Sequence, residues 1–389
     1  MALNKHKYTF LRLSKVFFAP LFSLFSFFIK KNNNIVITGS LNNEYSDNAK
    51  ALFEYLISLD GYKSRVYFVL NDDKKRADLN ILYPGKFISN TNMKDALFIL
   101  RAKYWYCSAM ELPLAVFFQR HIRHVVHLGH GMLYKRIGLL ERNSSWYKKL
   151  YYKLVTSSFS YTIATTEFCK NSIAQGFGMP DSRVVLTPQP KTLTISSSKP
   201  ISDYEKFNAD SMHILYAPTW RPYAQVKLFP FDDLDLEGFN EFLKEYKIHI
   251  WLRVHPRFEQ DIDKALLLCE NIHLFSAKEY EDINPYLSNF HALISDYSSI
   301  YYDFLTLERP VLFFDYDFEK YNSQVGVIDG YERVKCTKTT ESYKQFLSQL
   351  IEIKNNEFDL SSIHIINCLV NYSVDSGVAT KIMLKRLGL

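Results

Sequence analysis

The stretch from Ile35 to Leu70 decides the fold class. It begins with the apolar run Ile35-Val-Ile-Thr38, continues with a helical pattern over residues 47–59, and ends with Arg65-Val-Tyr-Phe-Val-Leu70. Short apolar runs on either side of a helix are typical of a parallel β-α-β unit. Further apolar runs follow over residues 104–107, 125–128 and 161–164, with helical stretches between them. The sequence therefore predicts an α/β fold whose parallel sheet is covered by helices on both faces.

A second alternation of strands and helices follows residues 188–203, where turn-forming residues break the apolar periodicity. The expected strands are residues 213–217, 248–254, 291–294 and 310–314, and the expected helices are residues 237–246, 261–268 and 298–307. A chain of 389 residues also exceeds the roughly 100–200 residues of one domain. We therefore expect two doubly wound, Rossmann-like domains with a ligand cleft at the carboxyl ends of their strands. The expected divisions are residues 1–31, 32–195, 196–370 and a C-terminal helix over residues 371–389.

The composition is that of an ordinary globular protein. Hydrophobic residues make up 47% of the chain and charged residues 23%, which excludes a disordered, collagen-like or multi-span membrane protein. The five cysteines lie far apart with no CxxC pair, which argues against a disulfide framework or a zinc site. A reducing cytoplasm is therefore the expected compartment.

The net charge of +6 lies entirely in the first 31 residues, which contain six basic residues and no acidic one. Between these basic residues runs an apolar, Phe-rich segment over residues 16–29, shorter than the roughly 20 residues of a membrane span. We expect this segment to lie on an anionic membrane surface without crossing it. A helix docked on the fold and a cleaved secretory signal are the alternatives, although no small-residue cleavage site follows.

A second basic band runs from Arg120 to Lys153 and includes Trp146 and Tyr147. Basic and aromatic residues together are typical of a membrane surface, and a solvated helix face is the alternative. No helix-turn-helix, zinc-finger or RNP-like pattern is present, so we expect no nucleic-acid partner.

Polar clusters follow several of the predicted strands. The first is Gly129-His130-Gly131, where a histidine on a bare turn is suited to accept a proton from an incoming hydroxyl. The nearby His121, His124 and His127 do not have the spacing of a standard set of metal ligands.

Three further clusters have the chemistry of an anion site. Thr219 and Arg221 follow the strand over residues 213–217 and suit phosphate oxygens, while Arg253 and His255 alternate after the next strand. Ser295-Asp-Tyr-Ser-Ser299 begins a helix, where Ser298 or Ser299 as N-cap would leave free backbone N–H groups.

Each cluster alone is explained equally well by capping or loop chemistry. Together they fit binding of a diphosphate and its attack by a hydroxyl. The Asp-x-Asp triplets at residues 233–235 and 315–317 are possible Mg²⁺ ligands, but such triplets are common by chance, and we favour a site without metal.

The ordered set of motifs resembles the CDP-glycerol glycerophosphotransferase family, the teichoic-acid primases and polymerases and their relatives in capsule synthesis. The most specific match runs from Leu293 through Glu308-Arg-Pro310 to Tyr321 and follows the family's "TDYSS…FD…RP…YD…Y" block. "YAPTWR" is matched by residues 216–221, "R-x-HP" by residues 253–256 and "Y-x-DN" by residues 45–48. The family's "WHGTPxK" survives only as His130, Gly131 and Lys135, and its "GxPR" appears as residues 188–191. The acceptor side is therefore where the chain departs most from the family.

The resemblance implies a GT-B arrangement of two Rossmann-like domains, with CDP held by the C-terminal one. His130 would be the base, and His255 would stabilise charge on the donor phosphates. The implied donor site also contains Thr219, Arg221, Arg253, Asp296, Ser298 and Ser299, and the implied acceptor-side loop contains Asp47, Gly131 and Lys135. The family acts without a metal or other cofactor.

By this resemblance we expect a peripheral enzyme at the cytoplasmic face of the cell membrane. It would transfer glycerol phosphate from CDP-glycerol to a lipid-linked saccharide and release CMP, and the length of the chain favours a primase over a processive polymerase. A CDP-ribitol transferase, a GT-B glycosyltransferase using a nucleotide sugar, and a non-catalytic membrane scaffold are the alternatives.

Overall fold

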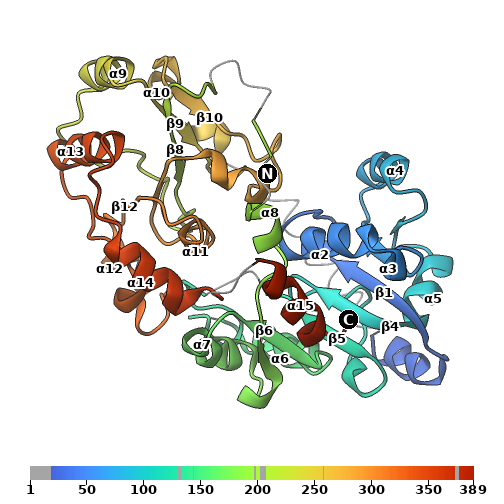
Figure 1. Cartoon of the computed structure of the whole chain (residues 1–389). Helices are drawn as coiled ribbons and strands as arrows, with labels where there is room; N and C mark the ends of the chain where they lie inside the picture. The colour runs from blue at the N-terminus through green and yellow to red at the C-terminus, as the bar shows by residue number, and fades with distance from the viewer. Residues whose placement is uncertain are drawn as a thin grey trace. The chain divides into compact units, whose positions relative to one another are not determined.

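The computed structural model describes residues 19–129, 133–142, 144–196, 199–201, 207–256, 258–372 and 376–389. The chain divides into two compact units (Figure 1). The N-terminal unit consists of Met1–His130, Gly138–Lys191 and Ser376–Leu389, and the C-terminal unit of Gly131–Ile137 and Thr192–Asp375.

The N-terminal unit contains a seven-stranded sheet in the order β3-β2-β1-β4-β5-β6-β7. Every described pairing in it is parallel. The strands are β1 (Asn32–Thr38), β2 (Val66–Val69), β3 (Phe87–Ile88), β4 (Ala102–Cys107), β5 (His124–His127), β6 (Tyr161–Ala164) and β7 (Val184–Leu186). The helices are residues 19–28, α2 (Asp47–Ser58), α3 (Asp60–Lys63), α4 (Asp73–Leu82), α5 (Met93–Arg101), α6 (Trp146–Thr156), α7 (Glu167–Phe177) and α15 (Ser376–Leu387).

The C-terminal unit is built on a five-stranded parallel sheet in the order β10-β9-β8-β11-β12. Its strands are β8 (Met212–Ala217), β9 (Ile248–Leu252), β10 (Ile272–Leu274), β11 (Ala292–Ser295) and β12 (Val311–Phe313). Its helices are α8 (Thr192–Ser196), α9 (Leu236–Glu245), α10 (Lys264–Leu268), α11 (Ile300–Leu305), α12 (Phe318–Gln324), α13 (Tyr343–Lys354) and α14 (Ser361–Val370). The two parallel sheets confirm the predicted α/β class.

The chain crosses between the two units several times, so the units are not joined by a single linker. Residues 131–137 belong to the C-terminal unit, where Lys135 forms an antiparallel bridge with Val327. The chain returns to the N-terminal unit at Gly138, where φ is +63° and a Cβ would lie 2.2 Å from the carbonyl oxygen of Gly176. Only glycine fits this position, because it has no Cβ and tolerates positive φ.

The last helix, α15, also belongs to the N-terminal unit and is not a separate element. The carbonyl of Leu387 accepts a hydrogen bond from the Tyr106 hydroxyl at 2.8 Å, and Met383 and Leu387 are buried. Packing of α15 therefore completes the core of the N-terminal unit.

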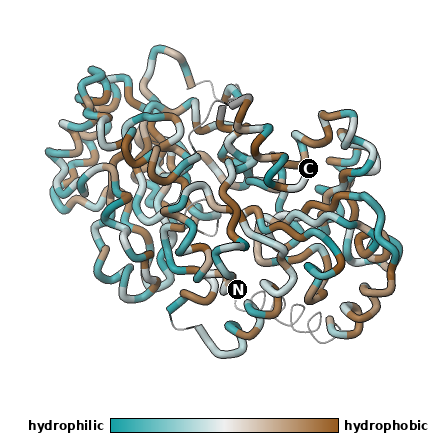
Figure 2. The backbone as a smooth tube through the Cα atoms, turned by 60° about the horizontal axis from the view of Figure 1, so that its bottom comes forward, coloured by the Kyte–Doolittle hydropathy of each residue, from teal (hydrophilic) through white to brown (hydrophobic). Residues whose placement is uncertain are grey.

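The N-terminal apolar segment is helical over residues 19–28, and residues 1–18 lie outside the described part of the chain. Figure 2 shows this helix, which follows the grey N-terminal trace, as mainly hydrophobic. Among the described residues, no helix is long and apolar enough to span a bilayer.

Candidate functional site

The predicted donor-site residues follow the carboxyl ends of three strands of the C-terminal sheet. In the sheet, Tyr216 of β8 pairs with Leu252 of β9 and with Ile294 of β11, and Ile294 pairs with Leu312 of β12. The loops that leave these parallel strands therefore start beside one another. They carry Thr219 and Arg221 after β8, Arg253 and His255 after β9, and Asp296, Ser298 and Ser299 after β11.

Asp296 joins two of these loops. Its carboxylate accepts hydrogen bonds from the backbone N–H of Thr219 at 2.7 Å and of Tyr297 at 2.6 Å, and it forms an ion pair with Arg221. Burial raises the pKa of Asp296, while Arg221 and the hydrogen bonds from Thr219 oppose that shift. Asp296 is 2% exposed, so its carboxylate is buried under the loops that it connects and does not contact solvent.

Arg221 differs from the sequence expectation. Its side chain is 0% exposed, and its Nε and Nη2 donate to Asp317 at 3.1 and 2.8 Å. Its Nη1 donates to Asp296 and to the Thr219 carbonyl. With its guanidinium enclosed by two carboxylates, Arg221 holds the loops together and does not present a cation to a phosphate.

The triplet Asp315-Tyr-Asp317 does not act as a pair of adjacent ligands. Asp315 accepts hydrogen bonds from Lys335, Tyr331 and Thr339 at 2.7, 2.9 and 2.7 Å. Asp317 accepts instead from Arg221 and from Tyr223, the latter at 2.7 Å. Burial alone would raise the pKa of Asp317, but the hydrogen bonds from Arg221 and Tyr223 outweigh it and lower that pKa.

No group of three or more His, Cys, Asp or Glu within the described ranges is arranged to hold a metal ion. Sequence reasoning missed Asp317 as the main partner of Arg221, because the triplet was interpreted only as a possible metal ligand or a loop.

His255 lines a cavity of about 450 Å³ beside this network. Its side chain is exposed, and the rings of Trp220 and Phe258 lie nearly parallel on the same cavity, with centroids 6.2 Å apart and planes 19° apart. Other lining residues are Pro218, Gln225, Val226, Lys227, Leu228, Leu234, Leu236, Val254, Asp261, Ile262, Asp263 and Leu266. An aromatic, largely apolar wall with a few polar groups is typical of sites for organic ligands.

Arg253 does not share this cavity with His255. Its Nη1 and Nη2 donate to the carbonyls of Ser276 and Glu281, each at 3.2 Å, and burial lowers its pKa to about 10. Arg253 is half-buried and ties the end of β9 to the loop after β10. Its contact with a phosphate stays a prediction.

Ser298 and Ser299 complete the described part of the predicted donor-side set, and Lys135 belongs to the predicted acceptor-side loop. Both serines are half-buried, and Ser299 is the N-cap of α11 without a capping hydrogen bond from its side chain. Lys135 is half-buried, and burial lowers its pKa while the charge of Asp296 opposes that shift. Lys135 thus lies near Asp296.

The N-terminal unit contains a second motif cluster, around Asp47 and Asn48 at the start of α2. Asn48 is fully buried, and its Nδ2 donates to the carbonyls of Leu128 and Gly129 at 3.1 and 3.0 Å. Asp47 pairs with the buried Lys191 at 3.3 Å. His130 and Gly131 lie outside the described residues, but the backbone just before them is fixed by Asn48.

Two segments that are distant in sequence therefore meet in this cluster, residues 45–48 and residues 188–191. Asn48 donates to Gln189 Oε1 at 3.1 Å and accepts from the backbone N–H of Lys191 at 3.0 Å. Asn48 was not among the predicted site residues, although it follows Asp47 in the same motif.

The chain resembles solved structures over most of its length. It superposes on the wall teichoic acid polymerase TagF with a TM-score of 0.73 at 22% identity, covering 92% of this chain and 89% of that one. It also superposes on a UDP-GlcNAc 2-epimerase from Neisseria meningitidis with a TM-score of 0.54 at 16% identity, covering 92% and 99%. These likenesses show the fold, which is GT-B-like.

Curated relatives are similar in sequence. A teichoic acid glycerol-phosphate transferase of Staphylococcus aureus is 25% identical over 318 residues, covering 76% of this chain and 77% of that protein. A teichoic acid poly(glycerol phosphate) polymerase of Bacillus spizizenii is 27% identical over 365 residues, covering 85% and 86%. The family model for CDP-glycerol:poly(glycerophosphate) glycerophosphotransferase matches residues 21–386, so the chain belongs to this family and is a glycerophosphotransferase.

Proposed function

We propose that this enzyme transfers glycerol phosphate from CDP-glycerol to a hydroxyl of a lipid-linked saccharide. The product is a new phosphodiester, formed with release of CMP during synthesis of a teichoic acid or a similar capsule polymer. The observation that carries the proposal is the cavity at the strand ends of the C-terminal sheet, where His255 stands beside the Asp296–Arg221 network in a chain of this family.

In the proposed reaction, the acceptor oxygen bonds to the phosphorus that carries glycerol, and the bond from that phosphorus to the CMP oxygen breaks. His255 stabilises the negative charge that moves onto the diphosphate, and the hydroxyls of the half-buried Ser298 and Ser299 donate hydrogen bonds to its oxygens. Arg221, Arg253 and Asp296 act as positioning residues, because their side chains bind other parts of the protein. The buried Thr219 hydroxyl has no hydrogen-bond partner among the described residues, and we assign it to the donor phosphates.

His130 takes the proton of the acceptor hydroxyl as that hydroxyl attacks. The hydrogen bonds from Asn48 to Leu128 and Gly129 support this role, because they fix the backbone directly before the histidine. Asp47, Gly131 and Lys135 belong to the same acceptor-side loop system in this proposal.

We also propose peripheral attachment to the cytoplasmic face of the membrane and a primase-like addition of few units. Attachment is supported by α6, on which Trp146 is 76% exposed and Tyr147 65% exposed next to Lys148 and Lys149. Aromatic and basic side chains together favour the headgroup region of an anionic bilayer. A lipid-linked acceptor would be reached from that position.

Isothermal calorimetry of the purified chain with CDP-glycerol, CDP-ribitol and UDP-glucose tests the donor without knowledge of the acceptor. We expect selective binding of CDP-glycerol that EDTA does not change. The variant His255→Ala should reduce turnover by about 10²–10³-fold. His364→Ala, which removes an exposed histidine of the same unit, should keep the wild-type rate. Binding of UDP-glucose alone, or an unchanged rate in His255→Ala, would contradict the proposal.

CDP-ribitol is a second candidate donor, because ribitol-phosphate polymerases are also relatives of the chain. One from Bacillus spizizenii is 28% identical over 172 residues, and one from Staphylococcus aureus is 20% identical over 350 residues. Calorimetry distinguishes the two donors, since a ribitol enzyme should bind CDP-ribitol more tightly than CDP-glycerol.

A further inference from the structure

The helix over residues 19–28 attaches to the N-terminal unit by its small, polar face. Ala19, Ser23 and Ser26 are three to four positions apart and therefore share one side of the helix. All three are buried, at 0%, 6% and 0% exposure. A surface helix of a globular protein normally buries its large apolar side chains instead.

Specific hydrogen bonds hold this inverted orientation. Ser26 Oγ donates to Gln119 Oε1 at 2.9 Å and accepts from Arg123 Nη2 at 2.8 Å. Ser23 Oγ accepts from the backbone N–H of Phe117 at 2.8 Å. Arg123 is itself fixed, because its Nη1 donates to the Ala102 carbonyl at 2.8 Å. Rotating the helix to bury its phenylalanines would leave these buried partners unsatisfied.

The opposite face consequently presents six large apolar side chains to the surroundings. Their exposed fractions are 67% for Leu21, 40% for Phe22, 61% for Leu24, 49% for Phe25, 43% for Phe27 and 81% for Phe28. A contiguous exposed apolar surface of this kind marks a site of association.

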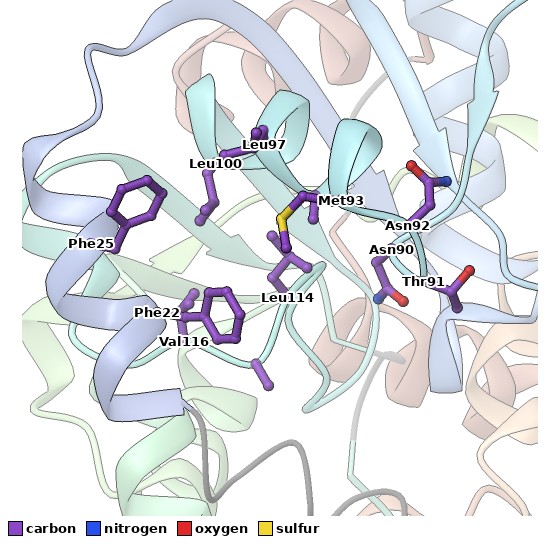
Figure 3. A pocket seen from close by; sticks show the side chains of 12 residues that line it. Phe22, Phe25, Asn90, Thr91, Asn92, Met93, Leu97, Leu100, Leu114 and Val116 are labelled. Atoms are coloured by element: carbon purple, nitrogen blue, oxygen red, sulfur yellow. The ribbon is translucent and has the colours of Figure 1, made fainter.

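An apolar cavity of about 310 Å³ opens between this helix and α5. Figure 3 shows Phe22 and Phe25 on the helix facing Leu97 and Leu100 of α5 across it. Met93, Ala96, Leu114, Ala115 and Val116 also line it. A volume near the low end of the roughly 300–1,000 Å³ of ligand pockets admits a slender molecule.

The few polar groups at the cavity are already used within the protein. Asn90 Nδ2 donates to the Pro113 carbonyl at 2.7 Å, and Thr91 Oγ1 is bonded to Ser89 Oγ at 2.7 Å. Asn92 Oδ1 accepts from the backbone N–H of Asp95 at 2.9 Å. The cavity therefore offers apolar contact and little else, which suits a hydrocarbon chain.

Basic residues outnumber acidic ones beside the cavity. Asp95 is the one acidic residue among residues 19–30 and 93–101. Lys30 follows the helix, and Lys94 and Arg101 stand at the two ends of α5, all three exposed. Cations beside an apolar face favour an anionic lipid headgroup over a neutral one.

We propose that this cavity holds one acyl chain of an anionic membrane phospholipid, while the exposed face of the helix lies at the headgroup boundary. The site is separate from the proposed donor site and does not depend on which donor the enzyme uses. It adds to peripheral attachment a defined lipid-binding site, in which a single chain leaves the bilayer and packs between the helix and α5.

Native mass spectrometry of the full chain in mild detergent, with added dioleoyl phosphatidylglycerol, tests the site. We expect one phospholipid to be retained by the wild type, and at least tenfold less by Ala96→Trp, which fills the cavity from α5. Ala115→Phe fills it from the facing loop and should have the same effect, so that a folding defect in one variant does not decide the result.

Phe28→Ser is the matched control, because Phe28 is the most exposed of the six large apolar side chains and does not line the cavity. It should weaken partition onto phosphatidylglycerol vesicles while retaining the single lipid. Equal retention by the wild type and both cavity-filling variants would overturn the proposal. So would retention of undecaprenyl phosphate alone, equal retention of dioleoyl phosphatidylcholine, or a lipid-free dimer.

Discussion

At the scale of single residues, the proposed donor site depends on a buried ion network more than on exposed cations. Arg221 is enclosed by Asp296 and Asp317, and Lys335 is paired with Asp315 at 2.7 Å. Buried pairs of this kind contribute little net stability but fix geometry, and breaking one leaves an uncompensated charge. His255 is consequently the exposed polar side chain that we assign to the donor phosphates.

We expect Asp317→Asn to destabilise the C-terminal unit by about 3 kcal/mol, because it leaves the buried Arg221 with one carboxylate in place of two. Urea unfolding followed by hydrogen exchange of that unit measures the change. Asp232→Asn removes a fully exposed carboxylate of the same unit, paired only with Lys227, and should have no measurable effect. Equal stability of the two variants would contradict the assigned role of Arg221.

Asn48→Ala should reduce turnover at least tenfold and leave the affinity for the donor unchanged. It removes the bonds that hold the carbonyls of Leu128 and Gly129, at a cost of about 1–3 kcal/mol for each buried group left unsatisfied. Steady-state kinetics with donor calorimetry separates the two effects. Asn80→Ala is the control. Asn80 hydrogen-bonds both the carbonyl and the N–H of Phe87, but it lies outside the motif at residues 45–48. Similar turnover in both variants would mean that Asn48 acts only on stability.

At the scale of elements, the sheet of the C-terminal unit contains a histidine fixed in its neutral form. His213 Nδ1 accepts from Trp251 Nε1–H at 3.1 Å, and its Nε2 donates to the Asn208 carbonyl at 2.8 Å. A proton added at Nδ1 would face the indole N–H, and burial lowers the pKa of His213 to about 4. The unfolded chain has the ordinary value of about 6.5.

Between pH 6.5 and 4, His213 therefore binds a proton in the unfolded state but stays neutral in the folded state. We expect stability to be complete above pH 6.5 and to fall as the pH is lowered through this window. Unfolding free energies of the C-terminal unit at pH 7, 6 and 5 should have a smaller slope in His213→Gln. An unchanged slope in His213→Gln would assign the acid sensitivity to other groups.

At the scale of the whole molecule, the helix over residues 19–28 and α15 complete the N-terminal unit. The helix over residues 19–28 is bonded to Gln119 and Arg123, and α15 is bonded to β4, β5 and β6 through Tyr106, His124 and Tyr161. The stability of this unit is thus coupled to contacts between residues that lie 93 to 281 positions apart in the sequence.

Deleting residues 376–389 should destabilise the N-terminal unit by several kcal/mol and leave the C-terminal unit unchanged. The deletion uncovers the partners of Met383 and Leu387, and loss of one buried side chain of that size costs about 2–5 kcal/mol. Hydrogen exchange resolved by segment distinguishes the units. Lys385→Ala in the same helix is the control. Lys385 is exposed, so its replacement should leave the stability of both units unchanged. Equal loss of protection in both units would contradict the division.

The sequence indicated most of the elements because their signals are local. The predicted strands at residues 125–128, 161–164 and 213–217 agree with β5, β6 and β8 to within one residue. The strands β3, β7 and β10 were missed, since two or three residues are too few to show a periodicity. These strands add to the sheet by pairing with neighbours distant in sequence.

By itself, the sequence determined the alternating α/β pattern, the order of the motifs and the placement of the donor-side residues after strands. Each of these follows from local periodicity and spacing, which the chain carries before it folds. Only the tertiary structure decided that two carboxylates enclose Arg221 and that Arg253 donates to two backbone carbonyls. It also decided that residues 131–137 belong to the C-terminal unit and that the helix over residues 19–28 directs its phenylalanines outward. Burial and hydrogen bonding depend on groups brought together from far along the chain, and no local pattern specifies which partner will be there.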